Sequence, residues 1–141
     1  MKRHATAHWN GTGKEGNGTL TSQTGVLTST PYNYISRFGD GAQTNPEELV
    51  AAAHAGCFSM KLAFVLEAAG AIPQNIETKC TIALDNGTVT SSHLDVKVKT
   101  DISKEKFDEC IADAKANCPI SKLLNTHITT SAEIVATQGV E

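Results

Sequence analysis

Cys57 and Cys118 are the side chains of this sequence whose types and settings could do chemistry. Cys57 follows Ala55-Gly56 in an apolar stretch, and Cys118 precedes Pro119. A thiolate can be oxidised to a sulfenic acid, which a second thiol converts into a disulfide. Thiolates also bind metals and attack acyl groups. The pair therefore indicates redox, metal-binding or acyl-transfer chemistry, and the simplest alternative is that both residues are buried core.

The two cysteines are expected in different local environments. Cys118 stands at the predicted N-cap of a short helix, where free backbone N–H groups and the helix dipole favour a thiolate. Cys57 lies three turns inside a predicted helix that begins at Pro46, and burial raises the pKa of a thiol. An activating charge must therefore come from elsewhere, and Arg37 is the candidate, since Arg3 is the only other arginine. The alternative for Arg37 is a solvated residue at the end of a strand.

Strands and helices in a mixed order are predicted to position these residues. Asn45 should cap the long helix, with Glu48 completing a capping box, and Gly70 should end it. Hydrophobic alternation and turn residues predict strands over 5–9, 19–24, 76–84, 93–99 and 127–135, and helical spacing predicts further helices over 104–116 and 119–124. Runs of strands separated by helices indicate the α+β class.

The composition indicates one soluble, cytoplasmic domain over residues 1–141. With 40% hydrophobic residues the chain can bury one core, and a formal charge of -3 gives no basic surface for nucleic acid or anionic lipid. No apolar leader follows the N-terminus, and Lys61 and Glu67 interrupt the longest apolar stretch, so we expect neither a signal peptide nor a membrane span. A reducing cytosol disfavours structural disulfides, and Cys80 and Cys110 are predicted core residues.

His54 offers two alternative functions for Cys57. One helical turn separates them, so with Cys118 they could ligate a metal, but a fourth ligand group is missing. His54 could also serve as the base in acyl transfer, but side chains at i and i+3 of a rigid helix point outward together rather than toward one substrate. We therefore expect a hydrogen-bonded packing role for His54, and no bound metal or cofactor. A non-enzymatic dimer that binds a ligand or metal through His54 and Cys57 remains the alternative function.

Motifs around both cysteines resemble those of a known family. The segments 44–49 and 53–60 strongly resemble the osmotically inducible protein C (OsmC) family, and 117–121 resembles its second-cysteine motif. Residues 7–9, 31–32 and 36–38 extend the resemblance over nearly the whole chain. The setting of His54 is more similar to the osmotically inducible subgroup than to the organic hydroperoxide resistance subgroup.

The resemblance implies an OsmC-like α+β fold, in which antiparallel sheets pack around a long buried central helix in an intertwined homodimer. It also implies a thiol peroxidase that reduces organic hydroperoxides, and hydrogen peroxide less well, in oxidative and osmotic stress defence. Carried over by motif, Cys57 is the peroxidatic thiol, Cys118 the resolving thiol, and Arg37 and Glu47 the activating pair. An external dithiol, for which a lipoylated protein is one implied donor, then reduces the Cys57–Cys118 disulfide.

The predicted long helix constrains how Glu47 can reach Cys57. They are ten residues apart (57 − 47) on that helix, which separates them by about 15 Å at a rise of about 1.5 Å per residue. If two copies of the helix cross antiparallel near Ala52, Glu47 of the partner subunit lies beside Cys57. We therefore expect two composite sites in the dimer, with Glu47 and Arg37 supplied in trans.

Overall fold

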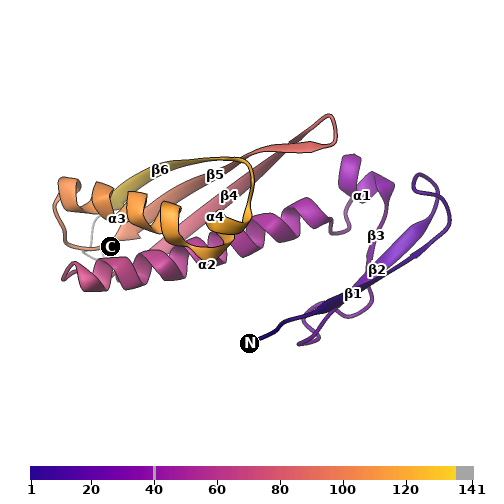
Figure 1. Ribbon diagram of the computed structural model, residues 1–141, viewed down its shortest axis with the longest axis horizontal. Helices are drawn as coiled ribbons and strands as arrows, with labels where there is room; N and C mark the ends of the chain where they lie inside the picture. The colour runs from indigo at the N-terminus through magenta and orange to yellow at the C-terminus, as the bar shows by residue number, and fades with distance from the viewer. Residues whose placement is uncertain (40, 136–141) are drawn as a thin grey trace. The chain divides into compact units, whose positions relative to one another are not determined.

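The computed structural model describes residues 1–39 and 41–135 of the chain (Figure 1). The chain divides into two compact units, Met1–Leu49 and Val50–Glu141. In chain order its elements are β1 (Ala5–Asn10), β2 (Asn17–Ser22), β3 (Thr30–Tyr32), α1 (Tyr34–Phe38), α2 (Pro46–Ala68), β4 (Asn75–Asp85), β5 (Thr88–Lys99), α3 (Lys104–Asn117), α4 (Pro119–Leu123) and β6 (His127–Val135). The predicted α+β class is confirmed.

The first unit contains a three-stranded antiparallel sheet in the order β1-β2-β3. Gly18 of β2 pairs with Trp9 on one side and with Tyr32 on the other. A Cβ atom at Gly18 would lie 2.5 Å from the Trp9 ring and 2.8 Å from the Tyr32 ring. Glycine is therefore required here, because only its bare backbone lets the two rings meet with their centroids 5.3 Å apart.

Arg37 lies on the short helix α1, where we expected the end of a strand. Asn33 and Ser36 close a capping box: the Ser36 N–H donates to Asn33 Oδ1 at 2.9 Å, and the Asn33 N–H donates to Ser36 Oγ at 2.8 Å. These two bonds satisfy backbone groups that a strand would have to pair. The capping box is therefore the local reason why Arg37 is presented from a helical turn.

Helix α2 begins and ends where the sequence predicts. The Glu48 N–H donates to Asn45 Oδ1 at 2.8 Å, which is the expected N-cap. The Glu48 carboxylate accepts from the Thr44 hydroxyl at 2.8 Å instead of closing the predicted capping box. Gly70 follows the helix with φ of +89°, the left-handed conformation that ends a helix.

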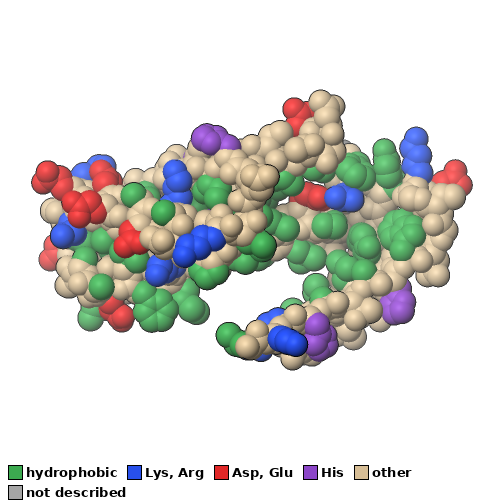
Figure 2. Space-filling model, in the orientation of Figure 1, with side chains coloured by type: hydrophobic (Ala, Val, Ile, Leu, Met, Phe, Trp, Pro, Cys, Tyr) green, Lys and Arg blue, Asp and Glu red, His purple; other side chains and the backbone are tan. Residues whose placement is uncertain are grey.

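The core of the second unit lies between the helices and one face of the β4-β5-β6 sheet. Along α2, Phe58, Leu62 and Leu66 are fully buried at four-residue spacing. They belong to one core cluster with the buried residues Leu94, Val96 and Val98 of β5 and Phe107 of α3. The other side of α2 differs, since Met60 is 66% exposed and Phe64 is 61% exposed. The expected central helix is thus buried along one stripe only, and Figure 2 shows hydrophobic side chains at the surface beside it. By length and composition α2 is also the one helix in the described part of the chain that could cross a membrane.

One strand pairing differs from the antiparallel sheets that we expected. β4 pairs with β5 antiparallel, as expected for the hairpin, but β6 pairs with β5 in parallel, from Ser91 opposite His127 to Lys99 opposite Val135. The chain leaves β5 through α3 and α4 before β6 begins. Such a helical crossover returns the chain to the same end of the sheet, so the new strand runs parallel.

Truncating the core at Phe107 should strongly destabilise the protein. Phe107 is fully buried, so Phe107→Ala should lower the free energy of unfolding in urea by about 3–5 kcal/mol. Ile72→Ala is the control, because Ile72 is 76% exposed and surface changes usually stay within about 0.5 kcal/mol. Equal losses for the two variants would contradict this description of the core.

Candidate active site

Cys57 and Cys118 meet in the second unit, although they are remote in the sequence. Cys57 is partly exposed on α2, whereas Cys118 is fully buried at the N-cap of α4, where the sequence placed it. Cys57 packs against the core cluster that contains Cys118, and each thiol shifts the pKa of the other, that of Cys57 upward and that of Cys118 downward. All four cysteines of the chain are free. The two predicted redox thiols are therefore already neighbours in the reduced protein.

The surroundings of this pair favour the negative charge on Cys118. Burial raises the pKa of Cys57, a backbone hydrogen bond at Ile120 lowers it, and the neighbouring Cys118 raises it again, for a net increase. Burial also raises the pKa of Cys118, but hydrogen bonds from the side chain and backbone of Ser121, together with the neighbouring Cys57, outweigh burial and lower it overall. Cys57 therefore needs a further positive charge before it can act as a thiolate at neutral pH.

Arg37 and Glu47 form a bidentate ion pair in the first unit. Nη2 of Arg37 lies 2.9 Å from Oε2 of Glu47, and Nε lies 3.2 Å from both carboxylate oxygens. The hydrogen bond to Glu47 raises the pKa of Arg37, against the smaller effect of burial. Nη1 takes no part in this pair, so it is the guanidinium nitrogen that could bind a thiolate or a peroxide oxygen.

Asn45 holds the two helices that carry this ion pair. Its Nδ2 donates to the carbonyl oxygen of Ser36 at 2.9 Å, while its Oδ1 caps α2. The last turn of α1, which carries Arg37, is thus tied to the first turn of α2, which carries Glu47. The capping residue found in the sequence therefore also sets the geometry of the ion pair.

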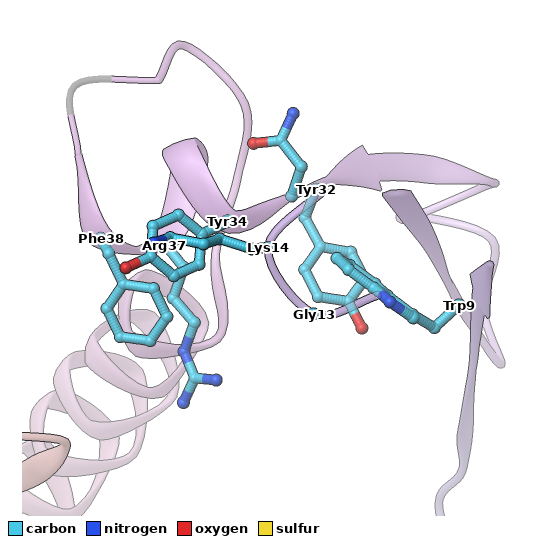
Figure 3. A pocket seen from close by; sticks show the side chains of 8 residues that line it. Trp9, Gly13, Lys14, Tyr32, Tyr34, Arg37 and Phe38 are labelled. Carbon is cyan, nitrogen blue, oxygen red and sulfur yellow. The ribbon is translucent and has the colours of Figure 1, made fainter. Parts of the chain in front are cut away.

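Arg37 also lines an aromatic cavity of about 580 Å³ in the first unit (Figure 3). Its aromatic walls are Trp9, Tyr32, Tyr34 and Phe38. The guanidinium carbon of Arg37 lies 5.0 Å from the centroid of the Phe38 ring, and Nζ of Lys14 lies 5.9 Å from that of the Tyr34 ring. Our sequence reasoning missed this cavity; its only signal was that the tryptophan and both tyrosines fall within the first 34 residues.

Cys57 borders a separate apolar groove of about 520 Å³ in the second unit. Met60, Phe64 and Pro119 supply its apolar surface, and Lys61 contributes a charged end. Because Cys118 is fully buried, Cys57 is the thiol of the pair that a substrate in this groove could reach.

His54 is a packing residue, as the sequence predicts. It is fully buried, and its two ring nitrogens lie 2.6 Å from Ser92 Oγ and 2.8 Å from Ser121 Oγ. Both nitrogens are thus engaged by hydroxyls, which is not the arrangement of a metal ligand. Within residues 1–39 and 41–135, no group of three or more His, Cys, Asp and Glu side chains could hold a metal ion.

The remaining two cysteines pack against the core. Cys110 is buried in the α3 stripe, whereas Cys80 on β4 is only partly buried. Burial raises the pKa of both thiols. Both positions agree with the predicted core role, although Cys80 also contacts the polar residues around His54.

Comparison with known proteins gives consistent matches. The model of the OsmC-like protein family matches residues 39–133. Peroxiredoxin OsmC of Escherichia coli (strain K12) is 40% identical over 87% of this chain and 90% of that protein. Organic hydroperoxide resistance protein-like 1 of Staphylococcus epidermidis is 33% identical over 68% of this chain and 74% of that protein.

Solved structures match over nearly the full chain. The OsmC-like protein from Mycoplasma pneumoniae superposes with a TM-score of 0.75 at 14% identity and covers 96% of this chain and 98% of its own. The organic hydroperoxide resistance protein OhrB of Bacillus subtilis gives 0.65 at 27% identity and covers 94% of this chain and 98% of its own. These matches agree with the predicted OsmC-like fold.

Removing the Cys118 thiol should make Cys57 more acidic. The neighbouring Cys118 raises the pKa of Cys57, in part through its charge. In the Cys118→Ala variant the pH profile for alkylation of Cys57 by iodoacetamide, followed by peptide mass spectrometry, should therefore move to lower pH. Cys110→Ala is the matched control and should leave the profile in place. A shift to higher pH in Cys118→Ala would contradict the effect of Cys118 on the pKa of Cys57 described here.

Proposed function

The chain belongs to the OsmC-like protein family and is a cysteine-based peroxidase; we propose that Cys57 reduces organic hydroperoxides and that Cys118 resolves the product. The observation that carries this proposal is the proximity of the two thiols, because Cys57 packs against the core cluster that contains Cys118 and each thiol shifts the pKa of the other. It supports a ready path to a disulfide, because the sulfurs meet without rearrangement of the core. The access of Cys57, but not Cys118, to the apolar groove supports the order of the two roles.

The proposed cycle has three steps. The Cys57 thiolate attacks the distal peroxide oxygen and the O–O bond breaks, which gives the Cys57 sulfenic acid and an alkoxide that takes a proton from solvent to become the alcohol. The Cys118 thiolate then attacks the Cys57 sulfur, so that the S–S bond forms and hydroxide leaves as the S–O bond breaks. An external dithiol finally reduces the disulfide by thiol exchange and leaves in its oxidised form.

Arg37 and Glu47 are the proposed activating pair. Because burial raises the pKa of Cys57, a nearby guanidinium would favour the thiolate and would also polarise the peroxide. Glu47 would hold the guanidinium plane by its bidentate contact, which a lysine could not reproduce. In this proposal, position 37 requires both the positive charge and the planar shape of the guanidinium.

We propose that Arg37 and Glu47 act on Cys57 of the partner subunit in a homodimer. On α2, Glu47 and Cys57 are ten residues apart (57 − 47), or about 15 Å along the axis at about 1.5 Å per residue. Ala52, Ala53 and Gly56 are exposed on α2, and a Cβ at Gly56 would meet nothing within 4 Å. Small exposed residues suit close helix crossing, and a second copy would cover the exposed Met60 and Phe64. Residues 1–141 would then work as one functional domain.

The proposed substrates are apolar hydroperoxides, with hydrogen peroxide reduced less well. The aromatic cavity beside Arg37 and the groove beside Cys57 could both bury an apolar group, which hydrogen peroxide lacks. The proposed reductant is a dithiol such as the lipoyl group of a lipoylated protein, whose apolar arm suits the same groove. The cycle needs continual thiol reduction, which supports a cytoplasmic location and a role in oxidative and osmotic stress defence.

Replacing Cys57 with serine should abolish peroxidase activity. Serine fits the same space but cannot form a sulfenic acid, so cumene hydroperoxide consumption with dihydrolipoamide should fall to the background rate. Cys118→Ser should consume one peroxide per chain to form the Cys57 sulfenic acid and a second as Cys57 over-oxidises to sulfinic acid, after which its activity is lost. Cys80→Ser should keep the Cys57–Cys118 disulfide, and a different disulfide in its peptide map would overturn the thiol assignment.

Mixing two inactive variants should restore activity if Arg37 acts in trans. Arg37→Ala and Cys57→Ser each lack one half of the site, but a mixed dimer contains one complete site. After subunit exchange half of the dimers are mixed, so about a quarter of the wild-type activity should return. As a control, each variant is taken through the same subunit-exchange procedure without the other variant. If the mixture stays inactive while size-exclusion data show mixed dimers, Arg37 acts on its own chain.

A further inference from the structure

His54 lies at the centre of a buried row of hydrogen bonds that ends on Cys118. Its Nε2 lies 2.8 Å from Ser121 Oγ, and Ser121 Oγ donates to Cys118 Sγ at 3.4 Å. On the other side, its Nδ1 lies 2.6 Å from Ser92 Oγ, which lies 3.2 Å from Cys80 Sγ. His54, Ser92 and Cys118 are fully buried. The proposed cycle has so far given no role to His54, Ser92 or Cys80.

The donors in this row all point toward Cys118. The Ser121 hydroxyl has one hydrogen, and because that hydrogen is donated to Cys118, Ser121 Oγ must accept from His54 Nε2–H. The neutral ring then accepts at Nδ1, so the Ser92 hydroxyl donates to it. Ser92 Oγ is left to accept from the Cys80 thiol. Each group thus fixes the direction of the next.

The row gives Cys118 a fixed set of donors in place of water. Its sulfur accepts from the Ser121 hydroxyl and from the Ser121 N–H, each at 3.4 Å, and the neighbouring Cys57 also lowers its pKa. A fully buried thiolate has no water shell, so protein donors must stabilise its charge. The hydroxyl of Ser121 could otherwise rotate toward another acceptor, and the His54 ring holds it in place.

We propose that Ser121 is a catalytic residue of the resolving step and that His54 positions it, so that Cys118 is held as a thiolate aimed at Cys57. This inference rests on the proposed function and deepens it. The step itself is the one given above: the Cys118 thiolate forms the S–S bond and the Cys57 S–O bond breaks. The departing hydroxide takes up the proton that Cys118 lost earlier to solvent, so the net product is water.

The titratable groups that face this row are few in the described unit. Cys57 on α2 contacts Cys118 directly, and Lys61 lines the groove outside Cys57. Beyond Ser121 stand His54 and then Cys80 on β4. Burial lowers the pKa of His54, which keeps the ring neutral and able to act as both donor and acceptor near pH 7.

Ser121→Ala tests the proposal through the pH dependence of disulfide formation. Reduced protein is mixed with one equivalent of cumene hydroperoxide, and the decay of dimedone-reactive sulfenic acid is followed from pH 5 to pH 10. Loss of the hydroxyl donor should raise the pKa of Cys118. A rise of one pKa unit lowers the thiolate fraction tenfold, partly offset by greater nucleophilicity, so resolution should slow about three- to tenfold below that pKa. Above that pKa the variant should match or exceed the wild-type rate.

Variants of His54 separate positioning from packing. His54→Gln keeps a side-chain N–H that can donate to Ser121 and should resolve nearly as fast as the wild type, whereas His54→Leu should behave like Ser121→Ala. Ser59→Ala is the matched control, because Ser59 on α2 donates to Thr78 at 2.7 Å, outside the row. It should leave the resolution profile unchanged.

Each outcome decides the matter. A resolution rate in Ser121→Ala that is unchanged at every pH, or slowed equally at every pH, overturns the proposal, since a packing defect does not depend on pH. Peroxide consumption in the first turnover should be unaffected in Ser59→Ala, the control variant outside the row. If the wild-type protein itself consumed no peroxide or formed no Cys57–Cys118 disulfide, the proposed function would fail, and that result is distinct from a change in the resolving step alone. Should His54→Leu not fold, Ser121→Ala and His54→Gln still give the answer.

Discussion

The cost of placing a negative sulfur away from water is the constraint on which this site depends. Burial raises the pKa of every cysteine in the chain before other contacts act. Only Cys118 has enough donors within its own unit to reverse that effect, through Ser121 and through its contact with Cys57. Cys57 lacks such donors, and in the proposed mechanism the guanidinium of Arg37, held by Glu47, supplies the missing positive charge. The proposed chemistry thus uses two ways to stabilise a thiolate: hydroxyl and amide donors at Cys118, and a full positive charge at Cys57.

Local signals in the sequence predicted much of the fold and the position of Cys118 at the start of a helix. Asn45 and Gly70 mark the ends of α2, and Cys118 stands at the start of α4, because capping depends on a few adjacent residues. Pairing direction depends on distant segments, so the parallel register of β6 was not visible from local patterns. The short helix at Arg37 was missed because its signal is one capping box over five residues.

The site features that the sequence did not reveal are those assembled from several elements. The row from Cys80 to Cys118 joins β4, β5, α2 and α4, and a serine such as Ser92 on a strand carries no sign of its partner. The aromatic cavity likewise joins residues of β1, β3 and α1. Family motifs identified Cys57, Cys118, Arg37 and Glu47 as a set, but not the polar residues behind Cys118. Buried hydroxyls of this kind are recognised only once their neighbours are known.

Cys118 has a further property, since it closes α3 and opens α4 with the same residue. Its N–H donates to Ala114 O at 3.0 Å, and its carbonyl accepts from Lys122 N–H at 3.1 Å. Its sulfur is also the cap that receives the Ser121 N–H. A disulfide sulfur is neutral and a weak acceptor, so the proposed disulfide would weaken this cap on α4 and its reduction would restore it. In the proposed cycle the order of the first turn of α4 would therefore follow the oxidation state of Cys118.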